Sequence, residues 1–257
     1  MACQLVSLSI SIFISLLVIG FIYVFSWNHH RSTKEAVILR AIGIVFAIFV
    51  SIVILLLTNY IDYENLTPTL SLSPYYLFES IVIPICLTII LFIGPIIDRF
   101  QQGTLFLALD PDEELPPFYS FARNYLLGPI LEEYFYRFLL TTLLIQCFSQ
   151  SSTILISSAI FSISHAHHHI KGLINGGETL EWVNFICHLI QTFIFACYAC
   201  CIYLRAQSVI SVILIHSFCN WMGPPRFDRL FSQRYLAIIS CLGIITCITL
   251  LSIYLVS

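Results

Sequence analysis

Long apolar runs recur along the whole chain, and short polar segments separate them. A helix needs about 20 apolar residues to cross the hydrocarbon core of a bilayer. Runs that reach or approach this length cover residues 4–27, 36–58, 76–97, 125–148, 153–168, 184–204, 207–222 and 236–256. The pattern predicts a bundle of about eight transmembrane helices. Because no sizeable soluble domain fits between the runs, we expect residues 1–257 to form a single polytopic membrane domain.

The composition agrees with this pattern. Of the 257 residues, 59% are hydrophobic and 10% are charged, whereas soluble domains carry about 25% charged residues. Such a chain cannot cover its surface with polar side chains, which predicts an all-α integral membrane protein. The net charge of −3 is small, and no basic patch indicates nucleic-acid binding. The first run is too long for the apolar region of a signal peptide and follows no basic segment, so we expect it to remain as a span.

Basic residues in the connecting segments predict the orientation. If eight spans alternate, most of them fall on one side, and the opposite side holds only Arg205. The residues on the richer side are Arg31, Lys34, Arg99, Arg123, Lys171, Arg226, Arg229 and Arg234. Since Lys and Arg concentrate in cytosolic loops, this side is predicted to be cytosolic and both termini lumenal or extracellular. An Asn65-Leu66-Thr67 glycosylation sequence then lies on the lumenal side, although Pro68 directly after it disfavours modification.

The ten cysteines lie mostly singly inside apolar runs rather than in the spacing of a secreted disulfide scaffold. Cys197, Cys200 and Cys201 form a CxxC sequence within one span. We interpret them as small, polarizable packing residues. A redox or metal-binding pair is the alternative.

Charged residues interrupt the fourth run, LGPILEEYFYRFLL, with Glu132, Glu133 and Arg137. A charge at the bilayer centre costs about 2.5–3.5 kcal/mol on insertion scales, so such residues indicate function. Glu133 and Arg137 are four residues apart and share a helix face, so they can neutralise each other in a structural role. Glu132 lies about 100° away around the helix and has no such local partner. A carboxylate in low dielectric binds a proton more readily, which suits a general base.

Histidines end the fifth run, FSISHAHHH. His165 is placed inside the apolar helix, whereas His167, His168 and His169 belong to its end. The three-residue tail is interpreted as a polar terminus at the membrane surface, with metal binding as the alternative. His165 by itself is equally compatible with a buried core histidine.

The seventh run, VILIHSFCNWMG, carries His216 and Asn220 four residues apart on one helix face. Both side chains donate hydrogen bonds, and two donors aimed at one point form an oxyanion hole. A hydrogen-bonded pair that holds neighbouring helices together is the alternative.

With the predicted orientation, these polar residues lie at a similar depth in the membrane. Glu132 lies near the cytosolic end of the fourth span, His165 near that of the fifth, and His216 and Asn220 near that of the seventh. We therefore expect an intramembrane polar cavity that opens to the cytosol.

Such a cavity suits hydrolysis by an activated water. Glu132 would accept the water's proton, His165 would orient the water and protonate the leaving amine, and the other two side chains would stabilise the oxyanion. Cys219 is a less favourable nucleophile, because a thiolate forms poorly in an apolar helix. No HExxH zinc signature is present, so we expect no cofactor. One Glu and several His still leave zinc as an alternative.

Three motifs together resemble those of the type II CAAX prenyl endopeptidases, within the wider ABI (CPBP) family of intramembrane proteases. They are Glu132-Glu133-x-x-x-Arg137, Phe161-x-x-x-His165 and His216-x-x-x-Asn220. The resemblance runs over residues 126–223, which would be the catalytic motif region. It implies that Glu132 and His165 activate water, that His216 and Asn220 stabilise the oxyanion, and that Glu133 and Arg137 support them.

The resemblance also implies the substrate and the compartment. Substrates would be prenylated CaaX proteins, farnesylated or geranylgeranylated, such as small GTPases. Cleavage would release the C-terminal aaX tripeptide. Eukaryotic members lie in the endoplasmic reticulum membrane, with the active site toward the cytosol. A transporter, or a catalytically silent membrane protein, could use the same polar residues, although no matching polar residues occur in the first half of the chain.

Overall fold

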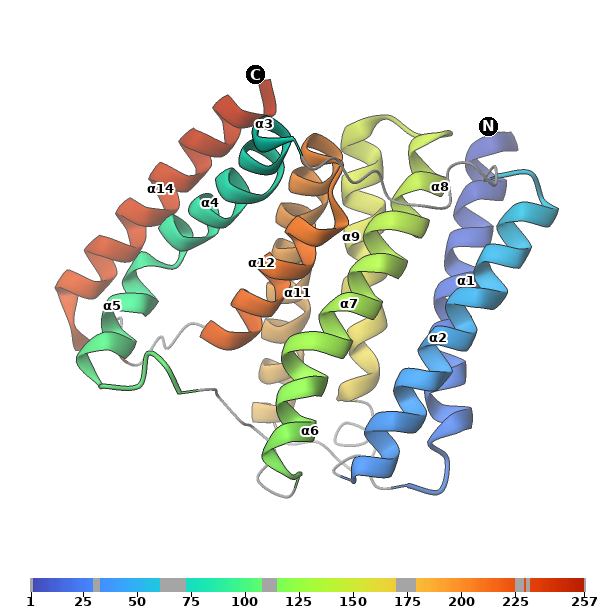
Figure 1. Ribbon diagram of the computed structural model, residues 1–257, viewed down its shortest axis with the longest axis horizontal. Coiled ribbons are helices and arrows are strands. Elements are labelled where there is room, and N and C mark those ends of the chain that lie inside the picture. The colour runs from blue at the N-terminus through green and yellow to red at the C-terminus, as the bar shows by residue number, and fades with distance from the viewer. Residues whose placement is uncertain are drawn as a thin grey trace. The chain divides into compact units, whose positions relative to one another are not determined.

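All regular elements in the part of the chain that the computed structural model describes are helices (Figure 1). The described residues are 2–29, 33–60, 73–107, 115–169, 179–224, 229 and 232–256. The predicted all-α class is confirmed. Arg31, Lys171, Arg226 and the glycosylation sequence at Asn65 lie outside the described residues, so the predictions that involve them stay predictions.

Four of the described helices are long and apolar enough to cross a membrane: α1 (Ala2–Phe25), α2 (Lys34–Leu57), α11 (Thr179–Ala206) and α14 (Arg234–Val256). A fifth span results if Tyr75–Leu91 and Ile93–Gln101, bent by 64°, are counted together. These helices support a multi-pass membrane protein. The total of about eight spans stays a prediction.

The bend in the third predicted run has a local cause. The segment consists of α3 (Pro74–Leu77), the π-helix η2 (Phe78–Val82), α4 (Ile83–Leu91) and α5 (Ile93–Gln101). Between α4 and α5, Phe92 leaves helical geometry with φ −95° and ψ 12°. Pro95 follows three residues later, and a proline has no backbone N–H and collides with the carbonyl group four residues before it. Pro95 is therefore compatible with a new helix that begins at Ile93, but not with a continuation of α4.

The fourth predicted run, residues 125–148, lies mostly within a stretch that is continuously helical from 117 to 145, but this stretch is not a uniform α-helix. It consists of α6 (Pro117–Ala122), η3 (Arg123–Leu127), α7 (Gly128–Glu133), η4 (Tyr134–Leu140) and α8 (Thr141–Ile145), of which η3 and η4 are π-helical. Short π-helical stretches are rare and are frequently found at functional sites.

Serine caps begin the two other helices that carry predicted site residues. The Ser149 side chain accepts a hydrogen bond from the Ser152 N–H at the start of α9 (Gln150–His165), which continues into the 3₁₀-helix η5 (Ala166–His168). Ser208 caps α12 (Val209–Met222) in the same way through the Ser211 N–H. Such caps satisfy backbone donors that the first helical turn leaves unpaired.

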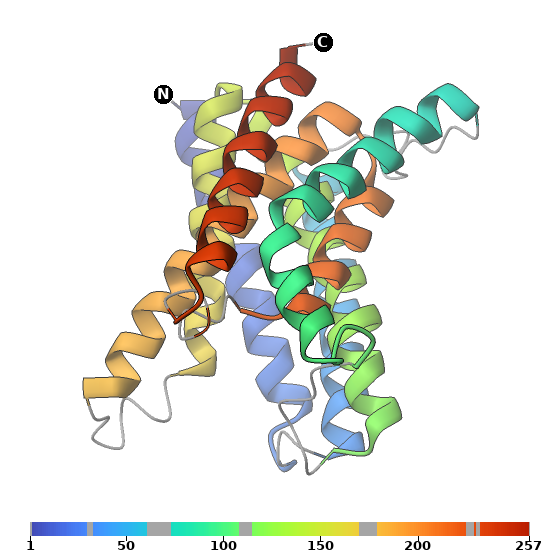
Figure 2. The same ribbon diagram turned by 90° about the vertical axis from the view of Figure 1, so that its left-hand side faces the viewer.

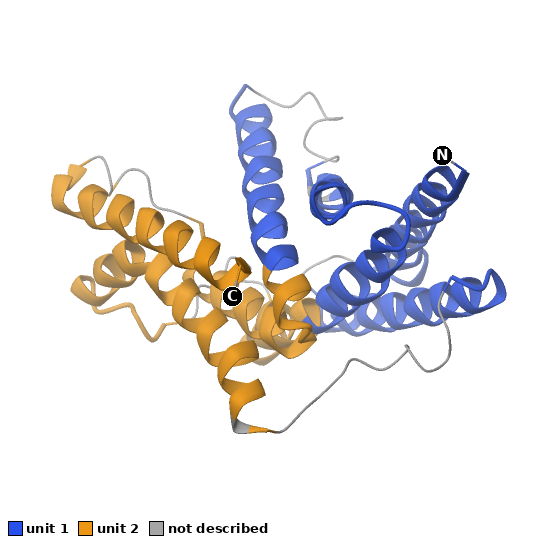
Figure 3. Ribbon diagram, turned by 90° about the horizontal axis from the view of Figure 1, so that it is seen from above, with its two compact units in different colours: residues 1–68, 130–201 blue, residues 69–129, 202–257 orange. Residues whose placement is uncertain are grey.

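The chain divides into two compact units (Figure 3). Unit 1 comprises Met1–Pro68 and Ile130–Cys201, and unit 2 comprises Thr69–Pro129 and Ile202–Ser257. The division falls inside α7 and α11. The prediction of a single polytopic domain is not decided by this division and stays a prediction.

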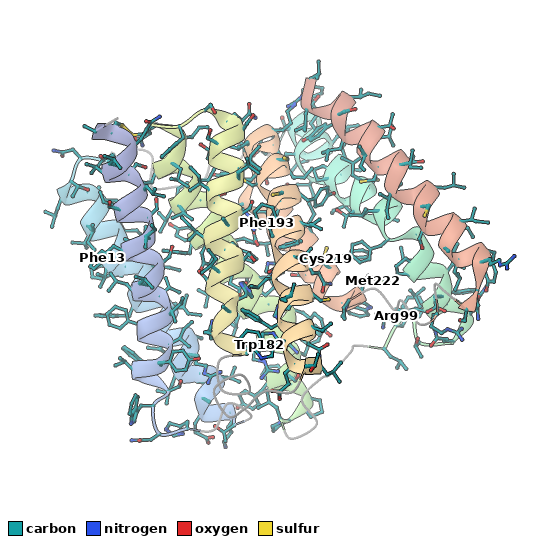
Figure 4. All side chains as sticks on the ribbon, turned by 180° about the vertical axis from the view of Figure 1, so that it is seen from behind. Phe13, Arg99, Trp182, Phe193, Cys219 and Met222 are labelled. Carbon is teal, nitrogen blue, oxygen red and sulfur yellow. A yellow bond between two sulfur atoms is a disulfide. The ribbon has the colours of Figure 1, made fainter. Side chains whose placement is uncertain are left out.

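In unit 1, α1 and α2 form a closely packed antiparallel pair (Figure 1). The rings of Phe21 and Phe46 meet edge to face with their centroids 5.0 Å apart. A Cβ atom on Gly43 would lie 2.8 Å from the carbonyl oxygen of Phe21, so this approach requires glycine. The other faces remain apolar and exposed, as Phe13 illustrates at 53% exposure (Figure 4).

In unit 2, α14 packs along α4 and α5 (Figure 2), again through small residues. A Cβ atom on Gly94 would collide with Ser240, and one on Gly243 would collide with the carbonyl oxygen of Ile90. Small residues at helix contacts are typical of membrane bundles, because they let the backbones approach closely.

Arg99, labelled in Figure 4, fixes the end of α12 in unit 2. Its guanidinium donates to the carbonyl oxygens of Trp221, Thr104 and Leu107, and the side chain is buried. This contact orients the last turn of the helix that carries His216 and Asn220. The sequence had indicated Arg99 only as a topology signal.

Cys3 and Cys147 form a disulfide in unit 1, with their Cα atoms 5.7 Å apart. It joins the start of α1 to the residues after α8. The sequence pattern, in which cysteines are dispersed through apolar runs, did not predict this pair. The other eight cysteines form no disulfide.

We expect denatured but unreduced protein to react with a maleimide at eight of its ten cysteines, and reduced protein to react at all ten. The physical reason is that a disulfide sulfur carries no thiol to alkylate. Intact mass spectrometry measures the difference, and Cys3→Ser provides the control because it frees Cys147. Ten modifications without reduction would contradict the pairing.

Candidate active site

The buried ion pair of Glu133 and Arg137 lies where α7 passes into η4. Arg137 Nε is 3.0 Å from Glu133 Oε2, and both side chains are fully buried. The guanidinium also stacks over the Phe161 ring, with 4.6 Å between its central carbon and the ring centroid. The predicted contact is confirmed. Because each charge neutralises the other away from solvent, this geometry supports a structural role for the pair.

Glu132, the neighbouring residue, points instead toward α9. Its Oε2 atom lies 3.6 Å from Nε2 of His165, and the two side chains are 30% and 16% exposed. Two consecutive glutamates thus face different surroundings: one is enclosed in the core, and the other reaches a partly open surface. The predicted approach of Glu132 and His165 is confirmed.

The second ring nitrogen of His165 determines which form of the imidazole faces Glu132. Its Nδ1 atom is 2.8 Å from the carbonyl oxygen of Phe161. A carbonyl oxygen can only accept, so Nδ1 carries the proton and donates. In a neutral imidazole, Nε2 is then an acceptor. A carboxylate and this nitrogen, both acceptors, can be satisfied together by one water that donates a proton to each.

Aromatic packing fixes the His165 ring. Phe161, one turn earlier on α9, stacks against it with 4.4 Å between ring centroids. Tyr136 from η4 contacts the edge of Phe161, with 5.0 Å between centroids. All three rings therefore belong to one packed cluster, which limits rotation of the imidazole.

A pocket in unit 1 contains the Glu132–His165 pair, and side chains from six elements line it: α1, α2, α7, η4, α9 and η5. Its lining residues are Val18, Ile19, Ile22, Ile44, Leu131, Glu132, Phe135, Tyr136, Ser164, His165 and His167. The side chains from α1 and α2 are aliphatic, whereas those from α9 and η5 are polar. The pocket is thus apolar on one side and, beside Glu132 and His165, polar on the other.

The histidine tail after His165 does not gather around one point. His167 places Nδ1 against the carbonyl oxygen of Ser164, and its own carbonyl oxygen accepts from the Tyr23 hydroxyl at 3.3 Å. His169 pairs with His188 of α11, with 2.7 Å between Nε2 and Nδ1. The His168 side chain lies outside the described residues. Among those the structure describes, no group of three or more His, Cys, Asp or Glu is placed to hold a metal ion.

The sequence had not singled out His188. It lies within an apolar span, and a polar residue in that setting was the signal that could have found it. Its partner could not be found in this way, because the contact depends on how η5 meets α11.

His216 and Asn220 lie on α12 in unit 2. The His216 side chain is buried, whereas Asn220 is exposed and donates from Nδ2 to the carbonyl oxygen of Asn124 at 2.8 Å. An amide NH₂ group has two protons, so this contact uses one of its two donors. Cys219 is half-buried beside Asn220. A shared site of these residues with Glu132 and His165 of unit 1 stays a prediction.

The CxxC sequence shows the contacts expected of packing residues. Cys200 is buried, accepts from the Ser157 hydroxyl at 3.4 Å and lies 3.9 Å from the Thr141 hydroxyl. These contacts place it in the core of unit 1, which favours the packing interpretation over a redox pair.

We expect Glu133→Gln to destabilise the protein far more than Glu132→Gln, by about 3–5 kcal/mol. Loss of Glu133 leaves the Arg137 charge buried without its counter-ion, whereas Glu132 is partly exposed. Thermal unfolding in detergent, followed by the fluorescence of a thiol-reactive dye, compares the two isosteric variants. Equal midpoints would contradict the structural role assigned to the pair.

Comparison with known proteins finds a family model that matches the segment with the three motifs. Residues 114–222 match the family model described as type II CAAX prenyl endopeptidase Rce1-like. The human protein named CAAX prenyl protease 2 is 28% identical over 161 residues, which cover 58% of this chain and 48% of the human protein. The protein of that name from Caenorhabditis elegans is 29% identical over 205 residues, covering 76% and 74%. The one from Arabidopsis thaliana is 28% identical over 106 residues, covering 40% and 34%.

The chain thus spans about half the length of the human relative. No solved structure matches it. The match at 114–222 includes all seven named residues of the three motifs, from Glu132 to Asn220. The resemblance predicted from these motifs is confirmed: over residues 114–222 the chain is similar to the Rce1-like type II CAAX prenyl endopeptidases.

Proposed function

We propose that this protein is a membrane endoprotease that removes the C-terminal aaX tripeptide from prenylated CaaX proteins. The observation that carries the proposal is the approach of Glu132 and His165 to 3.6 Å inside a pocket that is aliphatic on one side. Relatives named CAAX prenyl protease 2 in three organisms support the substrate class. Prenylated small GTPases are the natural candidates within that class.

In the proposed reaction, one water donates to Glu132 and to Nε2 of His165. Glu132 takes a proton from this water as its oxygen bonds to the carbonyl carbon of the prenylated cysteine. The carbonyl double bond opens to an oxyanion. When the oxyanion re-forms the carbonyl double bond, the C–N bond breaks and its electron pair stays with the amine nitrogen, which receives the proton from Glu132 by way of His165. The new cysteine carboxylic acid loses its remaining proton to solvent, so the products are the cysteine carboxylate and the free tripeptide.

We assign oxyanion stabilisation to His216 and Asn220. Each side chain can donate a hydrogen bond, and their spacing of four residues puts both on one face of α12. Removal of a single donor from the oxyanion hole of a serine protease costs about 10²–10³ in kcat. Glu133 and Arg137 act indirectly, because their ion pair holds the turn from which Glu132 projects.

The proposed site needs no metal. A carboxylate and an imidazole supply the base and the acid, and the hydrogen bond from Nδ1 to Phe161 sets the tautomer that faces the water. Zinc bound by the histidine tail remains the alternative to be tested.

We further propose that the protein lies in the endoplasmic reticulum membrane, with the active site toward the cytosol and both termini in the lumen. The asymmetry of Lys and Arg supports this orientation. So does the Cys3–Cys147 disulfide, which joins two chain segments on the predicted lumenal side. Disulfides persist in the oxidising lumen and are rare in the cytosol.

Purified protein should release the tripeptide from a farnesylated CaaX peptide, and Glu132→Gln should slow this by about 10²–10⁴-fold, the range for loss of a general base. His165→Ala should act similarly. Mass spectrometry of the peptide products measures the rate. The unfolding midpoint of Glu132→Gln is the control for folding.

The same assay with a strong chelator such as EDTA tests the metal-free mechanism. Undiminished cleavage supports it. Cleavage lost to the chelator and restored by zinc would overturn the assigned roles. A well-folded wild type that cleaves no prenylated peptide would instead favour a transporter or a silent partner protein.

We expect a glycosylation tag fused to the N-terminus, or one fused to the C-terminus, to be modified when the protein is made in microsomes. The reason is that the transferase acts only in the lumen. A tag inserted between α1 and α2 should remain unmodified, since that loop is assigned to the cytosol. A shift in gel mobility that a deglycosidase reverses measures modification. The opposite pattern would reverse the assigned orientation.

A further inference from the structure

The aliphatic side of the pocket comes from two helices that carry none of the three motifs. Val18, Ile19 and Ile22 line it from α1, and Ile44 lines it from α2. Val18 and Ile22 are four residues apart and Ile19 and Ile22 are three apart, so they share one face of α1. We call these four residues the aliphatic wall. The proposed reaction assigns the wall no role.

The chemistry of the substrate determines what must lie beside the catalytic pair. The bond to be cleaved follows the prenylated cysteine, and the isoprenoid is linked to the reacting carbonyl carbon only through Cα, Cβ and Sγ. When that carbonyl lies against Glu132 and His165, the first isoprene unit lies within the same pocket. An aliphatic surface removes that chain from water without requiring any hydrogen bond.

The position of the wall also suits a ligand that arrives from the bilayer. On α2, Ile42 lies about 200° around the helix from Ile44 and is 47% exposed, as is Val45 at 54%. On α1, Leu16 is 60% exposed. The two helices therefore present apolar surface to lipid on one side and to the pocket on the other.

We propose that the aliphatic wall binds the isoprenoid of the substrate and sets its preferred chain length. This inference rests on the proposed function and adds to it the surface that recognises the lipid. The aliphatic residues of the CaaX tail are the competing ligand for the wall. They lie on the leaving-group side of the scissile bond, whereas the isoprenoid belongs to the residue whose carbonyl is attacked.

The test compares cleavage of otherwise identical peptides that carry geranyl, farnesyl or geranylgeranyl chains. Ile44→Trp reduces the room along the wall, so it should lower the kcat/KM ratio of the farnesyl to the geranyl peptide by about tenfold or more, as apolar pockets discriminate by size. Ile44→Ala should shift the preference toward geranylgeranyl. The matched control is Ile42→Trp, the same substitution on the lipid side of α2, which should leave the ratio unchanged.

A second measurement does not depend on activity. A farnesyl peptide that carries a photoreactive diazirine on the isoprenoid should label peptides of α1 and α2 that contain wall residues. Labelling confined to other helices would overturn the inference, even if Ile44→Trp abolished cleavage by misfolding. An unchanged ratio in an active Ile44→Trp variant would overturn it too.

Peptides that differ in the aliphatic residues of the CaaX tail distinguish binding of the tail from binding of the isoprenoid. If Ile44→Trp changes the preference among peptides that differ only in their aliphatic residues, and not among isoprenoids, the wall binds the tail and the inference is wrong. Failure of the proposed function would look different, since the wild type would then cleave none of the prenylated peptides.

Discussion

The cost of a charge in an apolar surrounding constrains this site more than any other interaction. Glu133 and Arg137 are fully buried and stable there because their opposite charges are 3.0 Å apart. The Phe161 ring covers the guanidinium and also packs against His165. The ion pair thus reaches the proposed acid–base residues by two routes: along the backbone to Glu132 and through one aromatic ring to His165. A protein with this pair disrupted would lose the geometry around both proposed acid–base residues.

Helix periodicity predicted the local geometry of the site well. Residues four apart share a face, which was enough to pair Glu133 with Arg137 and to turn Glu132 elsewhere. Loop charges assigned Glu132 and His165 to one depth, and their side chains do meet. These predictions succeeded because each depends on one helix, or on the direction in which a helix crosses the membrane.

Contacts that depend on the packing of distant segments were not predictable in this way. The Cys3–Cys147 pair joins residues 144 positions apart, and no spacing rule connects them. The pair of His169 and His188 depends on how η5 meets α11. The pocket wall from α1 and α2 was missed for the same reason, because its residues look like any lipid-facing Val or Ile. An apolar residue in a membrane protein can face lipid or line a pocket, and composition does not distinguish these two roles.

The π-helix η4 has a consequence for how this chain tolerates change. A π-helical stretch accommodates one more residue than an α-helix of the same path, and here the surplus lies between Tyr134 and Leu140. Removing one residue there would convert the stretch to an α-helix of the same path, so the residues on either side, Glu132 and Cys147 among them, would keep their orientation. Removing one residue from α11, a regular α-helix, would instead rotate all that follows by about 100°. The π-helical stretch thus makes this one helix tolerant of a one-residue change in length.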